Sequence, residues 1–539
     1  MENLPSLVIS HPGKTYISAA SVFALLALTP SPSFIPTIAL ITIVRLAGWA
    51  FAPRPRSRAF IGAQIVSVAF FAAIAQLTPS LEALSTPSTA LVVLSAISAL
   101  TSAISSTLII ASSYAARLAN TPWTRLTVFP ALWATGWGFL SYISPVGQLA
   151  TWSPVVGLGP YWWIRQYFGQ WGVDWITAAW ASILSLVVGD WLMGVQDEAA
   201  SEQPLIQPIV LIDEPEDANE TVSHSPRAAS IRAENYSKLG LFCGLIFLMI
   251  PGYVISDIPL PAYSDETTPY VVGCALPVPR NNKGRISEPT LKDYLYESRT
   301  LQASADIVLW PESAVKFDSP AEKEDAFKLI QLPGNLNEGK YWGISFEEYI
   351  PANSTRGMYA RGVRRNGFAL LGSSGPPVFE YYKRKLVPVA ESFSLSPAFD
   401  DPPVVTVPIL RRRYANRPQT SLPVTASICL DFASSSSFEH LTSRPAFILA
   451  PARTWQIGVG YAMWEQAKAR ALETGSDILW CDGGEGGVSG IAGGGYHEVV
   501  QVGQGSWYKA IGIHAPYDEH PPIFIRIGKY GAFAVAWAV

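Results

Sequence analysis

Charged residues are scarce in this chain of 539 residues. Asp, Glu, Lys and Arg make up 15% of it, whereas soluble domains usually carry about 25%. Hydrophobic residues make up 49% of the chain, and its mean hydropathy is +0.22. This composition excludes a single soluble core and indicates a membrane protein with an attached soluble part. The net charge of −4 is too small to favour a partner selected by charge, and we expect no nucleic-acid partner.

Cysteine and histidine are also rare. The four cysteines form no Cys-x-x-Cys pair and no spacing typical of metal ligands, so the sequence predicts neither a zinc site nor a disulfide framework. We expect no metal and no cofactor. With six histidines and no Gly-x-Ser-x-Gly motif, no Ser-His-Asp arrangement stands out either.

Long apolar runs fill the first half of the chain instead. A membrane-spanning helix needs about 20 mostly apolar residues. Residues 1–192 therefore predict a transmembrane bundle of about six spans, and a seventh span follows a polar segment. The first candidate is short and could be a signal-peptide core, although a retained span fits better because no small-residue cleavage site follows. The candidate spans are residues 16–28, 34–52, 60–77, 90–118, 128–143, 166–192 and 239–256.

Basic residues in the short loops indicate the orientation. Alternate loops differ sharply, since residues 29–33 and 78–88 contain no Lys or Arg. The N-terminus is therefore predicted to be cytosolic, and seven crossings would place residues after 256 on the opposite face. That face is the endoplasmic reticulum lumen in a eukaryote or the periplasm in a bacterium. The basic residues that support this orientation are Lys14, Arg54, Arg56, Arg58, Arg117 and Arg125.

The remaining chain divides by composition. Residues 193–238 are polar and acidic and are typical of a disordered cytosolic loop. Residues 144–167 are rich in Trp and Pro, which indicates an interfacial belt or, alternatively, a lipid-facing entrance. Residues 264–526 alternate β-type and helical runs, as in an α/β layered domain. Residues 527–539 form a short apolar C-terminal segment.

The alternation in residues 264–526 predicts individual strands and helices. Strands are expected at residues 270–275, 306–310, 341–346, 367–372, 425–430, 446–450 and 478–480. Helices are expected at residues 290–300, 321–332 and 460–473.

Glu312 follows one of these predicted strands. The apolar run that ends at Trp310 is stopped by Pro311, so Glu312 is expected at the edge of the sheet, where strand ends meet a cavity. A solvated turn residue is the alternative for this glutamate taken alone.

Two further segments supply complementary chemistry. Lys383 follows an aromatic β-type pair, and Glu391 lies just beyond a proline-broken turn. Cys429 ends the apolar run that begins at Val424, and Asp431 lies two residues later. A solvated basic turn and a buried structural thiol are the alternatives for the lysine and the cysteine.

Together these groups indicate nucleophilic catalysis. A thiol needs a neighbouring base or cation to attack efficiently. Glu312 can remove the thiol proton and later return it to a leaving group. Lys383 can favour the thiolate and stabilise an oxyanion. Glu391 and Asp431 are supporting candidates, Glu391 as a carboxylate that orients Lys383 or the incoming nucleophile.

The motifs around these residues resemble the nitrilase superfamily with its Glu–Lys–Cys triad, and more closely its membrane branch, bacterial apolipoprotein N-acyltransferase. They are Trp-Pro-Glu-Ser at 310–313, Tyr-x-Lys-x-x-Leu-Val-Pro-x-x-Glu at 381–391 and Ile-Cys-x-Asp at 428–431. The resemblance extends to residues 470–475 and 482–484, to residues 129–133 and 170–173, and to the number of spans.

The resemblance implies an αββα sandwich on a transmembrane bundle, and a ping-pong mechanism. In that mechanism Cys429 takes an acyl chain from a phospholipid as a thioester. A lipidated protein or another amine acceptor then receives it as an amide. Some residues depart from the family pattern: Leu430-Asp431 replaces Tyr-Glu, Val389-Ala390 replaces Phe-Gly, and Asp482 replaces Asn.

Two other functions remain open from the sequence. The first is a membrane-tethered carbon–nitrogen hydrolase (an amidase), in which water resolves the thioester. The second is a catalytically retired domain that serves as a membrane scaffold or binding module.

Overall fold

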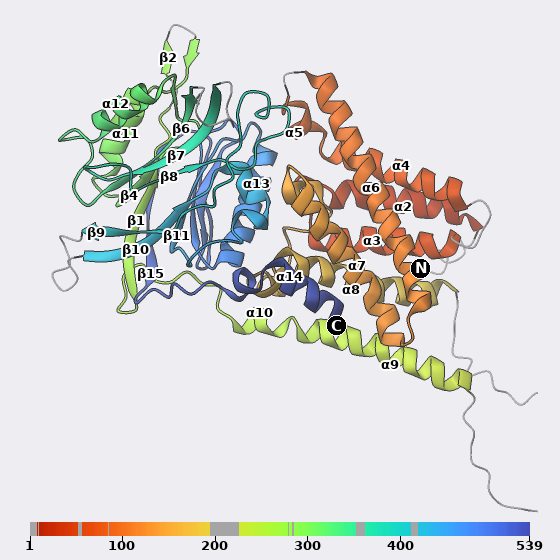
Figure 1. The fold of residues 1–539 in the computed structure, drawn as a ribbon. Helices are drawn as coiled ribbons and strands as arrows, with labels where there is room; N and C mark the ends of the chain where they lie inside the picture. Colours follow the sequence, from red (N-terminus) through yellow and green to blue (C-terminus); the bar gives the residue numbers. More distant parts are fainter. Residues whose placement is uncertain are drawn as a thin grey trace, which may run out of the picture.

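The computed structural model contains a helical part and an α/β sandwich that lie side by side (Figure 1). It describes residues 8, 10–51, 57–84, 86–193, 226–278, 280–282, 285–351, 362–410 and 419–538. Most of the predicted polar loop, residues 194–225, lies outside these ranges.

The helical part is built from long apolar helices joined by short turns. Proline occupies the first turn of α2, α6 and α7, where its missing N–H costs nothing. The helices are α2 (Pro12–Ala27), α3 (Phe34–Phe51), α4 (Ser57–Ala75), α5 (Leu77–Leu81), α6 (Pro87–Leu118), α7 (Pro122–Ile143), α8 (Ile164–Met193), α9 (Pro226–Phe247), α10 (Ile250–Val254) and α14 (Ile523–Ala538). Two short 3₁₀ helices, η1 (Gly147–Ala150) and η2 (Gly159–Tyr161), lie between α7 and α8.

Five helices within the described residues are long and apolar enough to cross a membrane, which indicates a multi-pass membrane protein. They correspond to the predicted third to seventh spans. The second predicted span contains a shorter apolar stretch, Phe34–Gly48, and the first lies in α2, which has 16 residues. The count of seven crossings and the predicted orientation remain predictions. The five stretches are Arg58–Ala75, Pro87–Leu118, Pro122–Ile143, Ile164–Leu192 and Ala233–Val254.

Two predicted segment boundaries differ from the structure. Helix α9 begins at Pro226, so residues 226–238 are helical and not part of a disordered loop. Helix α14 begins at Ile523 and crosses the predicted boundary at residue 527, with a kink at Gly528, whose φ is 59°. The C-terminal segment packs on α8, where Trp175 Nε1 donates to the Ala536 carbonyl oxygen at 3.2 Å.

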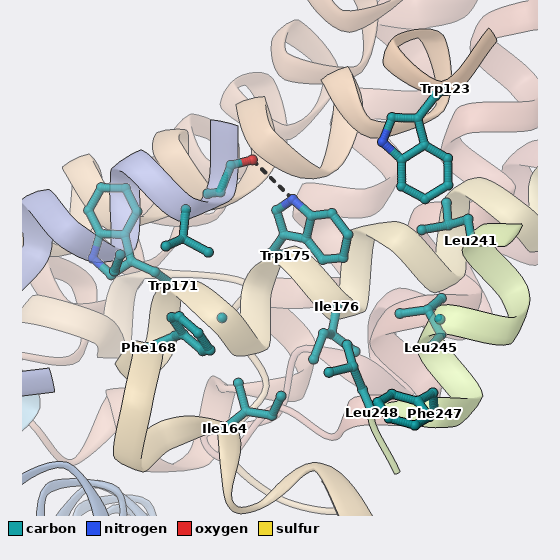
Figure 2. Close-up of a pocket in the computed structure, with 15 residues that line it drawn as sticks. Trp123, Ile164, Phe168, Trp171, Trp175, Ile176, Leu241, Leu245, Phe247 and Leu248 are labelled. Carbon is teal, nitrogen blue, oxygen red and sulfur yellow. Dashed lines mark hydrogen bonds between the residues drawn. The ribbon is translucent and has the colours of Figure 1, made fainter. Parts of the chain in front are cut away.

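An apolar cavity of about 420 Å³ lies among α7, α8, α9 and α14 (Figure 2). Its lining consists of aliphatic and aromatic side chains and glycines, among them Phe168, Trp171, Leu245 and Val535. A lining of this composition fits helices that are surrounded by lipid.

The sandwich consists of two mixed sheets. The seven-stranded sheet has the order β15-β1-β4-β6-β7-β8, with β5 paired to β6, and the six-stranded sheet has the order β14-β13-β12-β11-β10-β9. The strands of the first sheet are β1 (Thr267–Cys274), β4 (Ile307–Leu309), β5 (Val315–Phe317), β6 (Tyr341–Ile350), β7 (Val363–Leu371), β8 (Phe379–Tyr382) and β15 (Trp507–His514). Those of the second are β9 (Val405–Leu410), β10 (Gln419–Ala426), β11 (Phe447–Ala452), β12 (Asp477–Asp482), β13 (Val488–Gly493) and β14 (Tyr496–Val502). A separate hairpin pairs β2 (Arg280–Asn282) with β3 (Arg285–Ser287).

Helices cover both outer faces of the sandwich, which confirms the predicted αββα layers. Helices α11 (Leu291–Leu301) and α12 (Pro320–Ile330) pack on the first sheet, and α13 (Ile457–Thr474) packs on the second, between the sandwich and the helical part (Figure 1). Side chains alternate across each strand. In β4, Ile307 and Leu309 enter the core between the sheets, whereas Val308 enters the core beneath α11 and α12.

The expected strands and helices of this domain are present, with one correction at the cysteine. Strand β10 ends at Ala426, and Cys429 opens the 3₁₀ helix η4 (Cys429–Ala433). The predicted strand 425–430 is therefore wrong beyond Ala426. The sequence pattern missed β2, β3, β5, β9, β13, β14 and β15, and indicated β8 only through the aromatic pair before Lys383.

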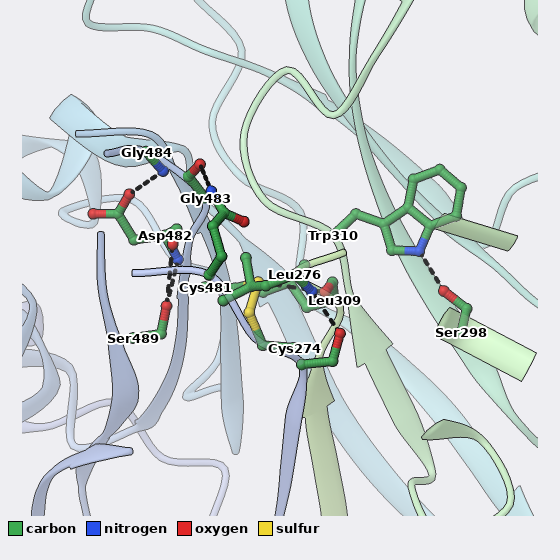
Figure 3. The surroundings of a disulfide bond; sticks show 12 residues. Cys274, Leu276, Ser298, Leu309, Trp310, Cys481, Asp482, Gly483, Gly484 and Ser489 are labelled. Atoms are coloured by element: carbon green, nitrogen blue, oxygen red, sulfur yellow. Dashed lines mark hydrogen bonds between the residues drawn. A yellow bond between two sulfur atoms is a disulfide. The ribbon is translucent and has the colours of Figure 1, made fainter. Parts of the chain in front are cut away.

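The structure contains a disulfide between Cys274 and Cys481 (Figure 3), contrary to the expectation from cysteine spacing. Cys274 ends β1 in one sheet and Cys481 lies in β12 of the other, 207 residues later, with their Cα atoms 5.5 Å apart. The bond joins the two sheets through the core. Local spacing could not reveal it, because the packing of the sheets brings the two cysteines together.

Candidate active site

Glu312 lies at the end of β4, as the sequence predicted. Its side chain is 3% exposed. Its Oε1 accepts hydrogen bonds from Lys383 Nζ at 2.6 Å and from Asn366 Nδ2 at 2.7 Å. Its backbone N–H donates to the Ala452 carbonyl oxygen at 3.3 Å, which joins it to the opposite sheet. The carboxylate is therefore held in one orientation by a cation and an amide.

Lys383 follows β8 and is almost completely buried. Its Nζ donates to Glu312 Oε1 and to both oxygens of Glu391, at 2.8 and 2.9 Å. The Val387 N–H fixes the Glu391 carboxylate at 2.8 Å. One ammonium group thus bridges two carboxylates, and Glu391 lies where it can orient Lys383.

Cys429 completes the cluster. Its buried side chain lies within electrostatic reach of Glu312, Lys383 and Glu391, whose charges all act on its pKa. Its φ of 44° is unusual for a residue other than glycine. The structure therefore brings Glu312, Lys383 and Cys429 together from three separate strand ends.

Backbone strain is concentrated at this site. Among the residues that the structure describes, three that are not glycine have positive φ, namely Ser313, Val389 and Cys429. Ser313 follows Glu312, and Val389 lies two residues before Glu391. Such conformations cost about 1–3 kcal/mol each and are concentrated at functional sites.

Burial and charge set the protonation states. Burial raises the pKa of Glu312 to about 7, although Lys383 opposes this change. Burial, together with the Glu312 charge, raises the pKa of the Cys429 thiol well above its usual value. For Lys383, burial lowers the pKa, but the neighbouring anionic groups outweigh it, and the net pKa is well above the ordinary one. At neutral pH the site therefore holds a protonated thiol, a charged ammonium and a carboxyl group near its midpoint.

Asp431 does not join this cluster. Its buried carboxylate accepts from the Lys385 N–H at 2.7 Å, the Tyr381 hydroxyl at 2.8 Å and the Ile428 N–H at 3.2 Å. Burial raises its pKa. Asp431 therefore joins the segment that carries Lys383 to the turn that carries Cys429.

The sequence interpretation missed Asn366. Its side chain contacts Glu312, and its carbonyl oxygen accepts from the Lys383 N–H at 2.9 Å. Asn366 is a polar residue directly before the apolar run 367–371, and that position was the available signal. Nothing in the run indicated a contact with Glu312.

A cavity of about 550 Å³ opens beside Glu312. Arg453, Trp455, Gly484 and Glu485 line it. Asp482 fixes this wall, since its carboxylate accepts from the Thr454 N–H at 2.9 Å and from the Thr454 hydroxyl at 2.7 Å. Trp455 Nε1 donates to the carbonyl oxygen of Pro79 in α5, at 3.0 Å. The wall of the cavity thus contacts the helical part.

The cysteine turn also contacts the helical part. A Cβ on Gly147, in η1, would lie 2.3 Å from the Ala433 carbonyl oxygen, so only glycine fits there. Buried Arg470, on α13, donates to the Phe432 carbonyl oxygen at 3.2 Å and to Gln148 Oε1 at 3.3 Å. Its partner Glu473 lies at 2.6 Å. Arg470 therefore connects η4 to η1.

The described residues contain no group of three or more His, Cys, Asp or Glu side chains that could hold a metal ion.

No family model matches the sequence, and no curated protein matches it. Solved structures with a similar fold cover about half of the chain. An amidase from Nesterenkonia sp. matches 48% of this chain and 94% of its own, at 14% identity and a TM-score of 0.34. Nit3 of Saccharomyces cerevisiae, from branch 10 of the nitrilase superfamily, matches 48% and 94%, at 13% identity and a TM-score of 0.33. Likenesses this distant assign no activity.

Proposed function

We propose that this protein is a membrane-bound N-acyltransferase that moves an acyl chain from a phospholipid, through a thioester on Cys429, to an amine. The observation that carries the proposal is the cluster of Glu312, Lys383 and Cys429, in which a buried thiol lies near a carboxylate that is itself held by a buried ammonium. The apolar helices beside it would bring the enzyme and a lipid donor into the same bilayer.

The first half-reaction forms the thioester. Glu312 removes the thiol proton as the sulfur attacks the ester carbonyl carbon, and Lys383 stabilises the resulting oxyanion. The tetrahedral intermediate then breaks the ester C–O bond. Glu312 returns its proton to the departing oxygen, and a lysophospholipid leaves.

The second half-reaction transfers the acyl chain. Glu312 accepts a proton from the incoming amine as its nitrogen attacks the thioester. The C–S bond breaks, the sulfur regains a proton, and the product is an amide. Water in place of the amine would give a free acid, which is the hydrolase alternative.

Two features support a catalytic domain on the non-cytosolic face. Basic residues gather in the alternate loops of the helical part. The disulfide between Cys274 and Cys481 fits an oxidising compartment. Impermeant labelling of single cysteines tests the orientation: a cysteine at residue 223 should react from the cytosol, and Ser319→Cys should not. The reverse pattern refutes this topology.

Intact-mass measurement of the full-length protein with phospholipid tests the activity. We expect an acyl adduct that Cys429→Ala abolishes and that an added amine discharges. Cys243→Ala is the matched control, because Cys243 is the other free cysteine and is exposed. Discharge in water as fast as with amine supports the hydrolase, and no adduct under either condition supports the scaffold. Each of those results refutes the acyltransferase.

A further inference from the structure

A second polar cavity, of about 230 Å³, lies within the helical part and is built from other residues than the candidate active site. It is formed by the C-terminal ends of α6 and α8, the N-terminal ends of α7 and α9, and α3. The N-terminal end of α9 lies far from the sandwich (Figure 1). The lining residues are Arg45, Ser112, Ser113, Ala116, Arg117, Pro122, Arg125, Leu126, Leu186 and Glu234.

Positive charge dominates this cavity. Three guanidinium groups line it, from Arg45, Arg117 and Arg125, against one carboxylate, that of Glu234. Glu234 already forms an ion pair with Lys238 at 3.2 Å. The N-terminus of α7 adds further positive potential, since Pro122 is its first residue. The described lining therefore favours an anion.

The three arginines are arranged from the interior outward. Arg45 is 6% exposed, and its guanidinium lies 4.4 Å from the centre of the Phe129 ring. Arg117 and Arg125 are exposed at the ends of α6 and α7. A buried cation between apolar helices is costly and is usually functional. The two exposed arginines lie where a phosphate could enter from one end of the bundle.

Apolar surface adjoins these charges. Leu118, next to Arg117, is 83% exposed, and Tyr114, one turn earlier, is 63% exposed. Leu126 and Leu186 lie inside the lining itself. Basic groups beside exposed apolar side chains suit a ligand that has both a phosphate and a hydrocarbon tail.

We infer that this cavity binds the phosphate headgroup of an anionic lipid, at the end of the bundle opposite the catalytic domain. Guanidinium groups bind phosphate oxygens through paired hydrogen bonds, and basic pockets between transmembrane helices bind anionic headgroups. The site takes no part in the acyl transfer proposed above. It would anchor the protein in a leaflet rich in anionic lipid.

Native mass spectrometry of the full-length protein in neutral detergent tests this site. The probes are phosphatidylinositol, phosphatidylcholine and inorganic phosphate. We expect phosphatidylinositol to bind at least about tenfold more tightly than phosphatidylcholine. Arg117→Gln/Arg125→Gln should weaken it about tenfold or more, since each hydrogen bond to a charged group contributes about one factor of ten.

Lys14→Gln/Arg58→Gln is the matched control, because it removes two exposed charges at the same end of the bundle but outside the cavity. This control should retain the lipid within about twofold of the wild type, as expected for charges that make no direct contact with it. Equal binding of the two lipids, or equal loss in the control, refutes the site. Displacement of the lipid by inorganic phosphate at equal concentration refutes a lipid ligand. Thioester formation on Cys429 should be unchanged in both double variants, so this inference and the proposed activity can fail independently.

Discussion

Replacing Asn366 with leucine should change the pH dependence of thioester formation. Asn366 Nδ2 donates to Glu312 Oε1 at 2.7 Å and stabilises the ionised carboxylate. Leucine has a similar volume and cannot donate. A hydrogen bond to a charged group contributes about 1.5–3 kcal/mol, so its loss should raise the pKa of Glu312 by about 1–2 units.

The size of the effect at neutral pH follows from the pKa of about 7 for Glu312. At pH 7 about half of the Glu312 population is ionised in the wild type, and about one tenth to one hundredth should be ionised in Asn366→Leu. Since only the ionised form can take the thiol proton, thioester formation should slow by about five- to fiftyfold at pH 7. Above about pH 9 the rates should converge.

The assay is rapid quenching followed by intact-mass measurement of the Cys429 adduct between pH 5 and pH 10. Glu347→Gln is the control, because Glu347 lies opposite Asn366 in the β6–β7 register and pairs with Lys316 at 3.8 Å, not with Glu312. Its profile should match the wild type. An equal loss at every pH in Asn366→Leu would contradict this reasoning, because it would indicate a packing defect and not a shifted base.

Wild-type thioester formation should rise about tenfold per pH unit below pH 7 and level off above it, because Glu312 must lose its proton; Glu312→Gln should lose this dependence. Cys274→Ser should lower the free energy of unfolding by about 2–5 kcal/mol, measured by thermal unfolding in detergent, whereas Cys243→Ser should not. Arg470→Met should lower the free energy of unfolding by about 3–5 kcal/mol, because Glu473 loses its buried partner. The same variant should slow thioester formation, and Arg470→Lys should partly restore the rate.

Each of these three predictions has an outcome that would contradict it. A flat pH profile in the wild type excludes Glu312 as the base. Equal unfolding of the Cys274→Ser and wild-type proteins excludes a stabilising disulfide. Unchanged thioester formation in Arg470→Met, despite lower stability, limits Arg470 to a structural role and excludes a positioning one.

Much of the fold was accessible from local sequence patterns. The apolar run at 307–310, ended by Pro311, predicted a buried strand with Glu312 at its edge, and β4 with its following turn confirms this. In the same way, the aromatic β-type pair before Lys383 predicted that this lysine follows a strand, which is β8. The prediction failed at Cys429, because the apolar run continues past Ala426 while the chain turns into η4. A hydrophobic pattern indicates burial. It does not distinguish a strand from a 3₁₀ turn, because a buried 3₁₀ turn is as apolar as a strand.

The sequence by itself determined the division into apolar helices and an α/β domain, and the three chemical groups to consider. These depend on composition and on short-range periodicity, which every segment carries within itself. Only the tertiary structure decided that Asn366 holds Glu312, that Cys274 bonds to Cys481, and that Arg470 connects the cysteine turn to the helical part. Those contacts join residues 54 to 322 positions apart, and they exist because two sheets and a helical bundle pack in one particular arrangement.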